Sequence, residues 1–264
     1  MPTREQTIDV AVGDGHIAGT LVTPGTQIPG VLFVHGWGGS QQQYLIRARE
    51  VAALGCVCLT FDLRGHAETR AQYEAVSREH NLDDVVAAYD VLVANPNVDS
   101  SAIAVVGSSY GGYLAAILAS MRDVKWLALR APALYLDSGW ELPKRQLHRD
   151  HDLVAYRQKL IPPAENRALR ACMAYQGDVL VIESENDSVI PHSVITSYVE
   201  ACTRAHSLTV RVIQGADHGL SGEGAQRSYT SLLVNWMTEM VQGARAGNKI
   251  EPTSTPQSSS QESA

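Results

Sequence analysis

Short apolar runs alternate with helix-like segments along most of this chain. Apolar runs such as VLFV at residues 31–34, CVCLTF at 56–61 and AIAVV at 102–106 are too short for buried helices, and a segment of helical periodicity follows each. Parallel strands need a crossover connection, which is usually a helix, so this alternation predicts a mainly parallel sheet with helices on both faces. The chain is therefore expected to adopt an α/β fold.

Two local signals place the first elements. Residues 6–12 and 16–22 have strand character and flank Asp14-Gly15, which predicts an antiparallel hairpin. Asn81 precedes an amphipathic stretch and is predicted to cap its helix, because a side-chain oxygen at that position accepts a free backbone N–H. The sequence thus predicts a hairpin ahead of the alternating strands and helices.

Composition divides the chain into one domain and a tail. The 264 residues are 45% hydrophobic, which is enough for a full globular core in residues 1–242. Residues 135–176 are dense in Arg, His, Asp and Pro between two apolar runs, and we expect them to form a short cap insertion. Residues 243–264 are rich in Ser, Thr, Pro and Gln, which predicts a disordered tail.

The sharpest chemical signal is the pentapeptide Gly107-Ser108-Ser109-Tyr110-Gly111. It fits G-x-S-x-G, and it stands between a predicted strand and a predicted helix, the setting in which this motif exposes a nucleophilic serine. Such a turn forces backbone atoms together, and glycine permits this because it lacks a β-carbon. Ser109 is therefore the candidate nucleophile.

A serine hydroxyl needs a base, and the base needs a partner that orients it. His218 lies in GADHGL, the loop after the last predicted strand, where the active site of a parallel sheet is expected. The loop before Ile190-Pro191 carries Asp187, which we predict to orient His218, with Glu185 as the alternative. The order of these residues along the chain, Ser109, Asp187 and then His218, matches the order of the catalytic triad in one fold family and differs from the trypsin-like and subtilisin-like orders.

A glycine-rich loop, His35-Gly36-Trp37-Gly38-Gly39, follows the strand at residues 31–34. It is placed to bring the Trp37 backbone N–H against a substrate carbonyl oxygen, and the Tyr110 N–H provides a second donor. Each donor of such an oxyanion hole contributes about 3 kcal/mol to transition-state stabilisation. His35 is predicted to hold the loop through hydrogen bonds.

These motifs resemble those of the α/β-hydrolase superfamily of serine hydrolases, over nearly all of residues 31–241. The segments that carry the resemblance are residues 35–39, 62–66, 107–112, 185–191 and 215–219. The resemblance implies a mostly parallel eight-stranded sheet, a Ser-His-Asp triad and no cofactor. The form Gly-x-Ser-Tyr-Gly-Gly is similar to that of small bacterial carboxylesterases and of prolyl-oligopeptidase-type catalytic domains.

Charge and composition exclude several other classes of protein. The formal net charge is −7, so binding of nucleic acid or of an anionic membrane surface is not expected. No apolar run approaches the roughly 20 residues of a membrane span. The first ten residues lack a secretory signal pattern and the four cysteines are too scattered for a disulfide framework, which together predict a cytoplasmic protein.

Three weaker patterns leave alternatives open. Residues 148–152 (HRDHD) place two imidazoles near two carboxylates, which is typical of an exposed polar helix more often than of a metal site, and no metal is predicted. Arg64 either lines the substrate pocket or pairs with Asp62. Tyr135 and Trp140 either form a pocket wall or pack the cap onto the domain.

The predicted reaction is hydrolysis of a small-molecule carboxylic ester through an acyl-enzyme on Ser109. An ester is favoured because an alcohol leaves more easily than an amine. A peptidase, amidase or thioesterase of the same fold remains the main alternative, and a non-catalytic binding module is less favoured because all three triad candidates are present. The sequence does not specify the acyl chain or the oligomeric state.

Overall fold

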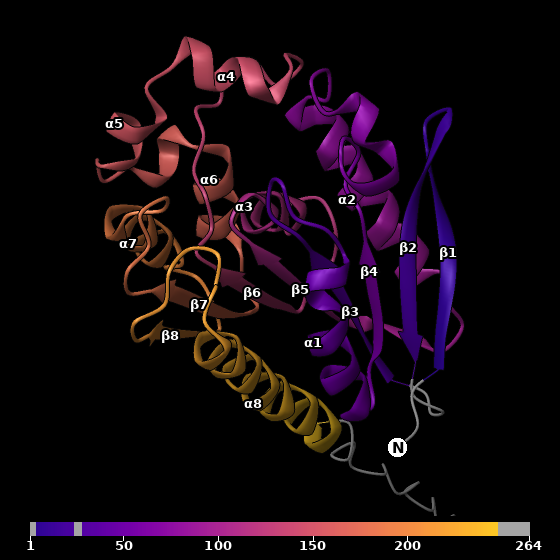
Figure 1. Cartoon of the computed structure of the whole chain (residues 1–264). Coiled ribbons are helices and arrows are strands. Elements are labelled where there is room, and N and C mark those ends of the chain that lie inside the picture. The colour runs from indigo at the N-terminus through magenta and orange to yellow at the C-terminus, as the bar shows by residue number, and fades with distance from the viewer. Residues whose placement is uncertain (1–3, 24–27, 248–264) are drawn as a thin grey trace, which may run out of the picture.

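One eight-stranded sheet forms the centre of the molecule (Figure 1). The structure is a computed structural model and describes residues 4–23 and 28–247. β2 runs antiparallel to its neighbours β1 and β4, and all other neighbouring strands are parallel. The predicted α/β class and the mostly parallel eight-stranded sheet are thus confirmed. In spatial order the strands are β1 (Arg4–Val12), β2 (Gly15–Thr23), β4 (Val57–Phe61), β3 (Ile28–Val34), β5 (Val98–Ser108), β6 (Trp126–Arg130), β7 (Asp178–Ser184) and β8 (Ser207–Ile213).

Helices cover both faces of this sheet. One face packs against α1 (Gln42–Ala53) and α8 (Glu223–Gly247), and the other packs against α2 (Arg78–Val93), α3 (Tyr110–Leu118), α6 (Arg167–Ala174) and α7 (His192–Ala201). Shorter helices are η1 (Ala67–Gln72), α4 (Lys144–Asp150), α5 (Leu153–Arg157) and η2 (Pro163–Glu165).

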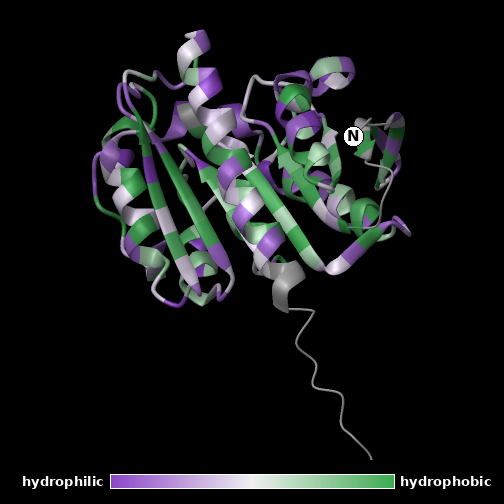
Figure 2. Cartoon of the chain, turned by 90° about the horizontal axis from the view of Figure 1, so that it is seen from below, coloured by the Kyte–Doolittle hydropathy of each residue, from purple (hydrophilic) through white to green (hydrophobic). Residues whose placement is uncertain are grey.

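Two separate apolar cores result, because successive side chains of a strand point to opposite faces. Along β3, Val31 and Phe33 join the core under α1 and α8, whereas Leu32 and Val34 join the core under α2 and α3. Burying a side chain of this size contributes about 1.5–3 kcal/mol. Figure 2 shows the same pattern, with apolar residues on the strands and polar residues on the outer helix surfaces.

Two local predictions were wrong in detail. The hairpin turn is Gly13-Asp14, because Val12 pairs directly with Gly15 and Gly13 takes the positive φ of 57° that the turn requires. Helix α2 begins one turn before Asn81, with Ser77 as its N-cap, whose side chain accepts the His80 N–H at 3.1 Å. Asn81 therefore lies inside the helix.

Residues 135–176, predicted to be a cap, contain α4, α5, η2 and α6. In Figure 1, α4 and α5 lie at the upper end of the molecule, above α3, α6 and α7. Helix α6 packs against α3 and buries Leu169 and Cys172 in the core of that face. The last part of the segment thus belongs to the layer of helices that covers the sheet.

The closing helix is longer than its apolar pattern indicates. Helix α8 continues to Gly247, past the predicted domain end at residue 242. Residues 248–264, the remainder of the predicted tail, lie outside the described residues. No helix in the described part of the chain has the length and apolarity needed to cross a membrane.

Candidate active site

Ser109 occupies the tight turn between β5 and α3. Its φ is 52°, a left-handed conformation that costs a non-glycine residue free energy and that is found at functional sites. A β-carbon on Gly107 would lie 2.5 Å from the Gly111 carbonyl oxygen, and one on Gly111 would overlap the carbonyl oxygen of Val34. Both glycines are therefore required by the close approach of α3 to the ends of β5 and β3.

The three predicted triad residues lie together at the carboxyl edge of the sheet. His218 Nε2 is 3.0 Å from Ser109 Oγ, and His218 Nδ1 is 2.7 Å from Asp187 Oδ2. The Asp187 carboxylate accepts, so Nδ1 carries a proton and Nε2 is free to accept from the Ser109 hydroxyl. The hydroxyl, imidazole and carboxylate thus form one continuous hydrogen-bonded chain.

Asp187 is held by its own loop as well as by His218. Its Oδ1 accepts the backbone N–H groups of Val189 and Ile190, both at 2.8 Å. Burial raises the pKa of Asp187, but the hydrogen bonds from His218, Ile190 and Val189 outweigh burial and hold the pKa below its usual value. The carboxylate is therefore ionised at neutral pH. The alternative, Glu185, instead accepts the Gly215 N–H at 2.7 Å and does not contact His218.

Two buried histidines shape the glycine-rich loop at residues 35–39. His35 Nε2 accepts the Leu63 N–H at 3.0 Å, and His66 Nε2 accepts the Gly38 N–H at 2.9 Å. Burial lowers the pKa of both rings, that of His35 to about 4. Both are therefore neutral at pH 7 and tie the loop to the segment after β4. The contacts of His35 agree with its predicted structural role, whereas the contact of His66 was not predicted.

The segments that carry the two predicted oxyanion donors, Trp37 and Tyr110, lie beside Ser109. Tyr110 begins α3, so its N–H is among the four at the helix start that have no acceptor within the helix. The loop that carries Trp37 runs beside the serine, since a β-carbon on Gly36 would lie 3.2 Å from Ser109 Cβ. The rings of Trp37 and Tyr110 meet edge to face, with centroids 5.6 Å apart. Both segments therefore lie next to Ser109 and contact each other.

Lys144 joins these two segments, although no sequence signal pointed to it. Its ammonium lies 4.0 Å from the Trp37 ring centroid, 4.6 Å from that of Tyr110 and 4.9 Å from that of Tyr135. The side chain is buried, and burial lowers its pKa, while a hydrogen bond and the charge interaction with Tyr135 act in the opposite direction. Cation–π contacts of this kind strengthen when water is excluded.

Arg130, at the end of β6, is a second residue that sequence reasoning missed. Its Nη2 donates to the carbonyl oxygen of His218, and its own carbonyl accepts the Ser109 N–H at 2.9 Å. One residue thus contacts both the serine turn and the histidine loop. Because the two loops are more than 100 residues apart in sequence, only the folded chain reveals this link.

Arg64 does not pair with Asp62. Its Nε donates to Asp84 Oδ1 at 2.5 Å, and its backbone N–H donates to Oδ2 of the same carboxylate at 2.8 Å. Asp62 instead accepts from the backbone and side chain of Gln41, both at 2.8 Å. Of the two alternatives left open for Arg64, pairing with Asp62 is therefore wrong, because Asp84, inside α2, comes into contact with Arg64 only once the helix packs on the sheet.

Tyr135 and Trp140 pack residues 135–140 onto the domain. Tyr135 is buried in the same core as Tyr113, and Trp140 stacks on Tyr113 with centroids 6.0 Å apart. Arg78 reaches the carbonyl oxygens of Leu136 and Ser138 from α2. These contacts favour the packing role over that of a pocket wall.

Among the described residues, no three His, Cys, Asp or Glu side chains gather as metal ligands do. The His148 side chain, part of the run weighed as a metal site, lies outside the described residues.

Solved structures with this architecture show that the chain has the α/β-hydrolase fold. A dienelactone hydrolase from Anabaena variabilis is 21% identical, with 90% of this chain and 98% of that chain covered and a TM-score of 0.66. Est1E from Butyrivibrio proteoclasticus, bound to ferulic acid, is 15% identical, with 89% and 99% covered and a TM-score of 0.71.

A larger protein also matches. Acylaminoacyl peptidase from Pyrococcus horikoshii is 15% identical, with a TM-score of 0.68, and the match covers 90% of this chain but 42% of that one. No curated protein matches the sequence. The model of the prolyl oligopeptidase family matches residues 41–244, which is most of the chain. The chain therefore belongs to the prolyl oligopeptidase family.

Proposed function

We propose that this protein is a serine hydrolase that cleaves small-molecule carboxylic esters, with Ser109 as nucleophile, His218 as base and Asp187 as the group that orients the base. The observation that carries the proposal is the hydrogen-bonded chain from Ser109 Oγ through His218 to Asp187, at 3.0 Å and 2.7 Å. In this geometry the base is within reach of the proton it removes, and the carboxylate sets its tautomer.

The reaction follows from these contacts. Ser109 Oγ attacks the ester carbonyl carbon while its proton passes to His218 Nε2, and the ionised Asp187 stabilises the imidazolium. The N–H groups of Trp37 and Tyr110 bind the oxygen that becomes negative, each contributing about 3 kcal/mol. His218 then protonates the leaving alcohol, and water attacks the acyl-enzyme with the same base.

We propose that α4 and α5 form the short cap, because Lys144 at the start of α4 packs against the ring of Trp37. A cytoplasmic location is also proposed, and it is supported by the buried thiols of Cys58, Cys172 and Cys202, which form no disulfide. Est1E, which has the same fold, is solved with ferulic acid bound, and this makes aryl acids a reasonable first class of acyl group to test.

Replacing the nucleophile tests the proposal directly. Ser109→Ala is expected to lower the turnover of short p-nitrophenyl esters by roughly 10³-fold or more, because only binding and the oxyanion hole remain. Its matched control is Ser108→Ala, which removes a neighbouring hydroxyl that faces Tyr229 and not His218. The control should keep its activity within a few fold. Full activity in Ser109→Ala would exclude this serine as nucleophile.

A peptidase or amidase is the second candidate, and the family match favours it. The two substrate classes separate when p-nitrophenyl acyl esters and aminoacyl p-nitroanilides are compared by kcat/KM on one preparation. A higher kcat/KM on the anilides would replace the ester proposal, and a higher value on acyl thioesters would identify a thioesterase. A fluorophosphonate probe tests the binding-module alternative, because a module without an activated serine should not react.

A further inference from the structure

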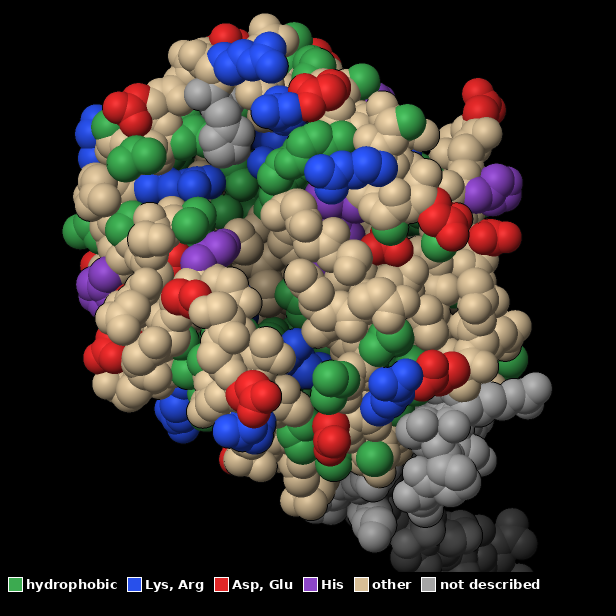
Figure 3. All heavy atoms as spheres, viewed as in Figure 1, with side chains coloured by type: hydrophobic (Ala, Val, Ile, Leu, Met, Phe, Trp, Pro, Cys, Tyr) green, Lys and Arg blue, Asp and Glu red, His purple; other side chains and the backbone are tan. Residues whose placement is uncertain are grey.

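A pocket lies between α1 and α8, beside the segments that carry the candidate active site. Its volume is about 790 Å³, and Figure 3 shows the surface hollowed between these two helices, with a basic side chain inside. Ser108 and Gly219 line it, each next in sequence to a triad residue, whereas Ser109, His218 and Asp187 do not. The pocket is therefore separate from the proposed site of hydrolysis.

Two buried guanidinium groups line this pocket. Arg47 from α1 is 8% exposed and Arg130 from the end of β6 is 6% exposed. In the described part of the chain, no ion pair includes either of them. Burying a charge without an opposite charge is costly, so two such groups around one cavity call for an anion.

The hydrogen bonds of these two groups are incomplete as well. Arg47 donates from Nη1 to the Gln43 carbonyl oxygen at 2.7 Å, and Arg130 donates from Nη2 to that of His218. The Nε of each is buried and has no hydrogen-bond partner. A guanidinium carries five N–H donors, and its fork matches the oxygens of a carboxylate or a phosphate. The N–H donors without an acceptor and the positive charges without an ion-pair partner thus both indicate an anionic ligand.

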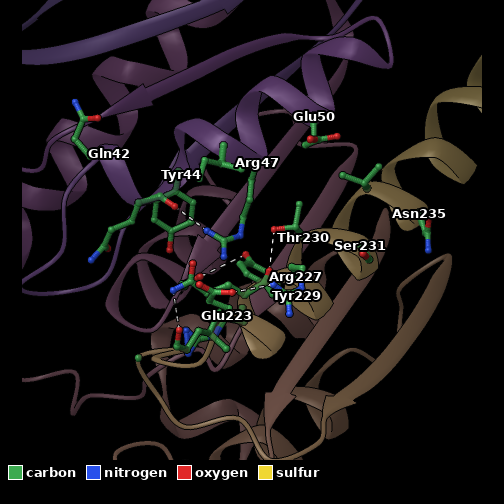
Figure 4. Close-up of a pocket in the computed structure, with 18 residues that line it drawn as sticks. Gln42, Tyr44, Arg47, Glu50, Glu223, Arg227, Tyr229, Thr230, Ser231 and Asn235 are labelled. Carbon is green, nitrogen blue, oxygen red and sulfur yellow. Dashed lines mark hydrogen bonds and ion pairs between the residues drawn. The ribbon is translucent and has the colours of Figure 1, made fainter.

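An aromatic wall with hydroxyl groups stands beside the cations. The Arg47 guanidinium lies 4.6 Å from the ring centroid of Tyr229, and Ser108 Oγ is 3.5 Å from the Tyr229 hydroxyl. Burial raises the pKa of Tyr44 to about 12, so its hydroxyl remains a donor at neutral pH. In Figure 4, Tyr44 and Arg47 from α1 face Tyr229 from α8 across the pocket.

The rim carries charged side chains that are exposed to solvent, among them Glu50 on α1. Arg227 and Glu223, both exposed on α8, pair with each other at 3.1 Å. The positive charge is thus concentrated at the inner end of the pocket, around Arg47 and Arg130, beside the tyrosine rings. This arrangement suits a molecule with an anionic head and an apolar or aromatic body.

We propose that the pocket between α1 and α8 is a binding site for a small organic oxyanion, a carboxylate or a phosphate monoester, held by Arg47 and Arg130. Such a ligand contacts the back of the loop that carries His218, since Gly219 and Leu220 line the pocket. The site is distinct from the serine centre and does not depend on the proposed hydrolysis.

Calorimetric titration of the full chain at low salt tests the proposal. The probes are benzoate and phenyl phosphate, with neutral benzamide as the uncharged analogue. At least one anion is expected to bind with a stoichiometry of about one and a dissociation constant below about 10 mM. Benzamide, which carries no charge, is expected to show no binding in the same concentration range. The two anions distinguish a carboxylate ligand from a phosphate ligand.

Arg47→Gln is the decisive variant, because Arg47 contacts no triad residue. It should weaken anion binding roughly tenfold or more. Arg49→Gln is the matched control on the same helix, since Arg49 is exposed and paired with Glu5 outside the pocket, and it should bind as the wild type does. If Arg47→Gln does not fold, Ser231→Trp is the substitute variant. Ser231 is exposed at the rim of the pocket, and a tryptophan there should block the entrance and weaken anion binding.

Three results would overturn the proposal. The first is that neither anion binds the wild-type protein up to about 10 mM. The second is unchanged binding in Arg47→Gln or, in its place, in Ser231→Trp, because the anion then occupies another site such as the oxyanion hole. The third is an equal loss in Arg49→Gln, which would mean that general surface charge and not the pocket attracts the anion.

Discussion

At the scale of single residues, burial determines which groups near the serine are charged. Asp187 is buried yet ionised, because three N–H donors outweigh its loss of solvation. His35 and His66 are buried and neutral, because burial disfavours the charged imidazolium and lowers the pKa of both rings, and the Nε2 of each ring accepts a backbone N–H. Neutral rings thus hold the glycine-rich loop at residues 35–39, and a charged carboxylate holds the ring of His218.

The role proposed for Asp187 predicts a specific loss. Asp187→Asn keeps the shape of the side chain but no longer stabilises the imidazolium or the tautomer of His218, so kcat should fall by roughly 10³- to 10⁴-fold. Glu185→Gln is the matched control, because Glu185 contacts Gly215 and not His218. Ester turnover measured for both variants tests the assignment, and comparable losses in the two would refute it.

The low pKa of His35 predicts how stability depends on pH. The pKa is about 4 in the folded protein and 6.5 as the reference value, so between these values the unfolded chain binds the proton and the folded one does not. The free energy of unfolding should therefore decrease as pH falls from about 6.5 to about 4, with a contribution of about 3 kcal/mol from this residue.

Urea unfolding at pH 7, 5.5 and 4.5 measures this effect. His35→Gln should show a shallower decrease with falling pH, whatever its stability at pH 7. The remaining slope includes His66, whose pKa burial also lowers. Identical slopes in the variant and the wild type would show that His35 does not titrate as described.

At the scale of elements, the strand–turn–helix unit around Ser109 depends on backbone contacts that only glycine allows. Helix α3 begins directly after the serine and lies so close to the sheet that Gly111 touches the carbonyl groups at the end of β3. The left-handed φ of Ser109 is maintained because β5, β3 and α3 are all anchored in the same core. The strain is thus held by packing that extends well beyond the turn.

Two glycine substitutions distinguish the steric need for glycine at the serine turn from the general effect of glycine on helix propensity. Gly111→Ala should prevent formation of the turn and yield little or no active folded protein, because the new β-carbon overlaps the Val34 carbonyl oxygen. Gly224→Ala, in open space at the start of α8, should instead stabilise the fold by about 0.5–1 kcal/mol. Thermal unfolding and ester turnover check both, and a fully active, stable Gly111→Ala would contradict this account of the turn.

At the scale of the whole molecule, the triad lies at the carboxyl edge of the sheet, where segments from distant parts of the chain meet. Ser109, Asp187 and His218 follow β5, β7 and β8 respectively, and the glycine-rich loop at residues 35–39 follows β3. On one side, Lys144 connects α4 to this loop and to α3. On the other, Arg130 connects the sheet to the His218 loop beside the pocket between α1 and α8.

The connection through Lys144 predicts opposite effects on activity and stability. Lys144→Met fills a similar volume but removes a buried cation, so the free energy of unfolding should stay the same or increase. Trp37 and Tyr110 lose the charge that fixes their rings, so kcat should fall by roughly tenfold with little change in KM. Lys125→Met is the control, since that lysine is exposed and contacts Trp126 instead. Unchanged kcat in Lys144→Met would remove Lys144 from the positioning of the site.

Local patterns in the sequence determined a large part of this protein. Apolar periodicity predicted the sheet and the main helices. A half-buried strand buries every second residue and a helix buries every third or fourth, so residues close together in the sequence show which element they form. Ser109, Asp187 and His218 were predicted as a triad, and the structure brings the three side chains together. Each follows a strand, and parallel strands deliver their carboxyl ends to one edge.

Only the tertiary structure decided the contacts made by long polar side chains. Arg64 bonds Asp84 and not Asp62, and Lys144 lies among the rings of Trp37, Tyr110 and Tyr135. A flexible side chain several bonds long reaches partners far away in sequence, and which partner it meets depends on how helices dock. No periodicity records that choice, so the charged groups around the triad and in the pocket between α1 and α8 emerge only from the packed chain.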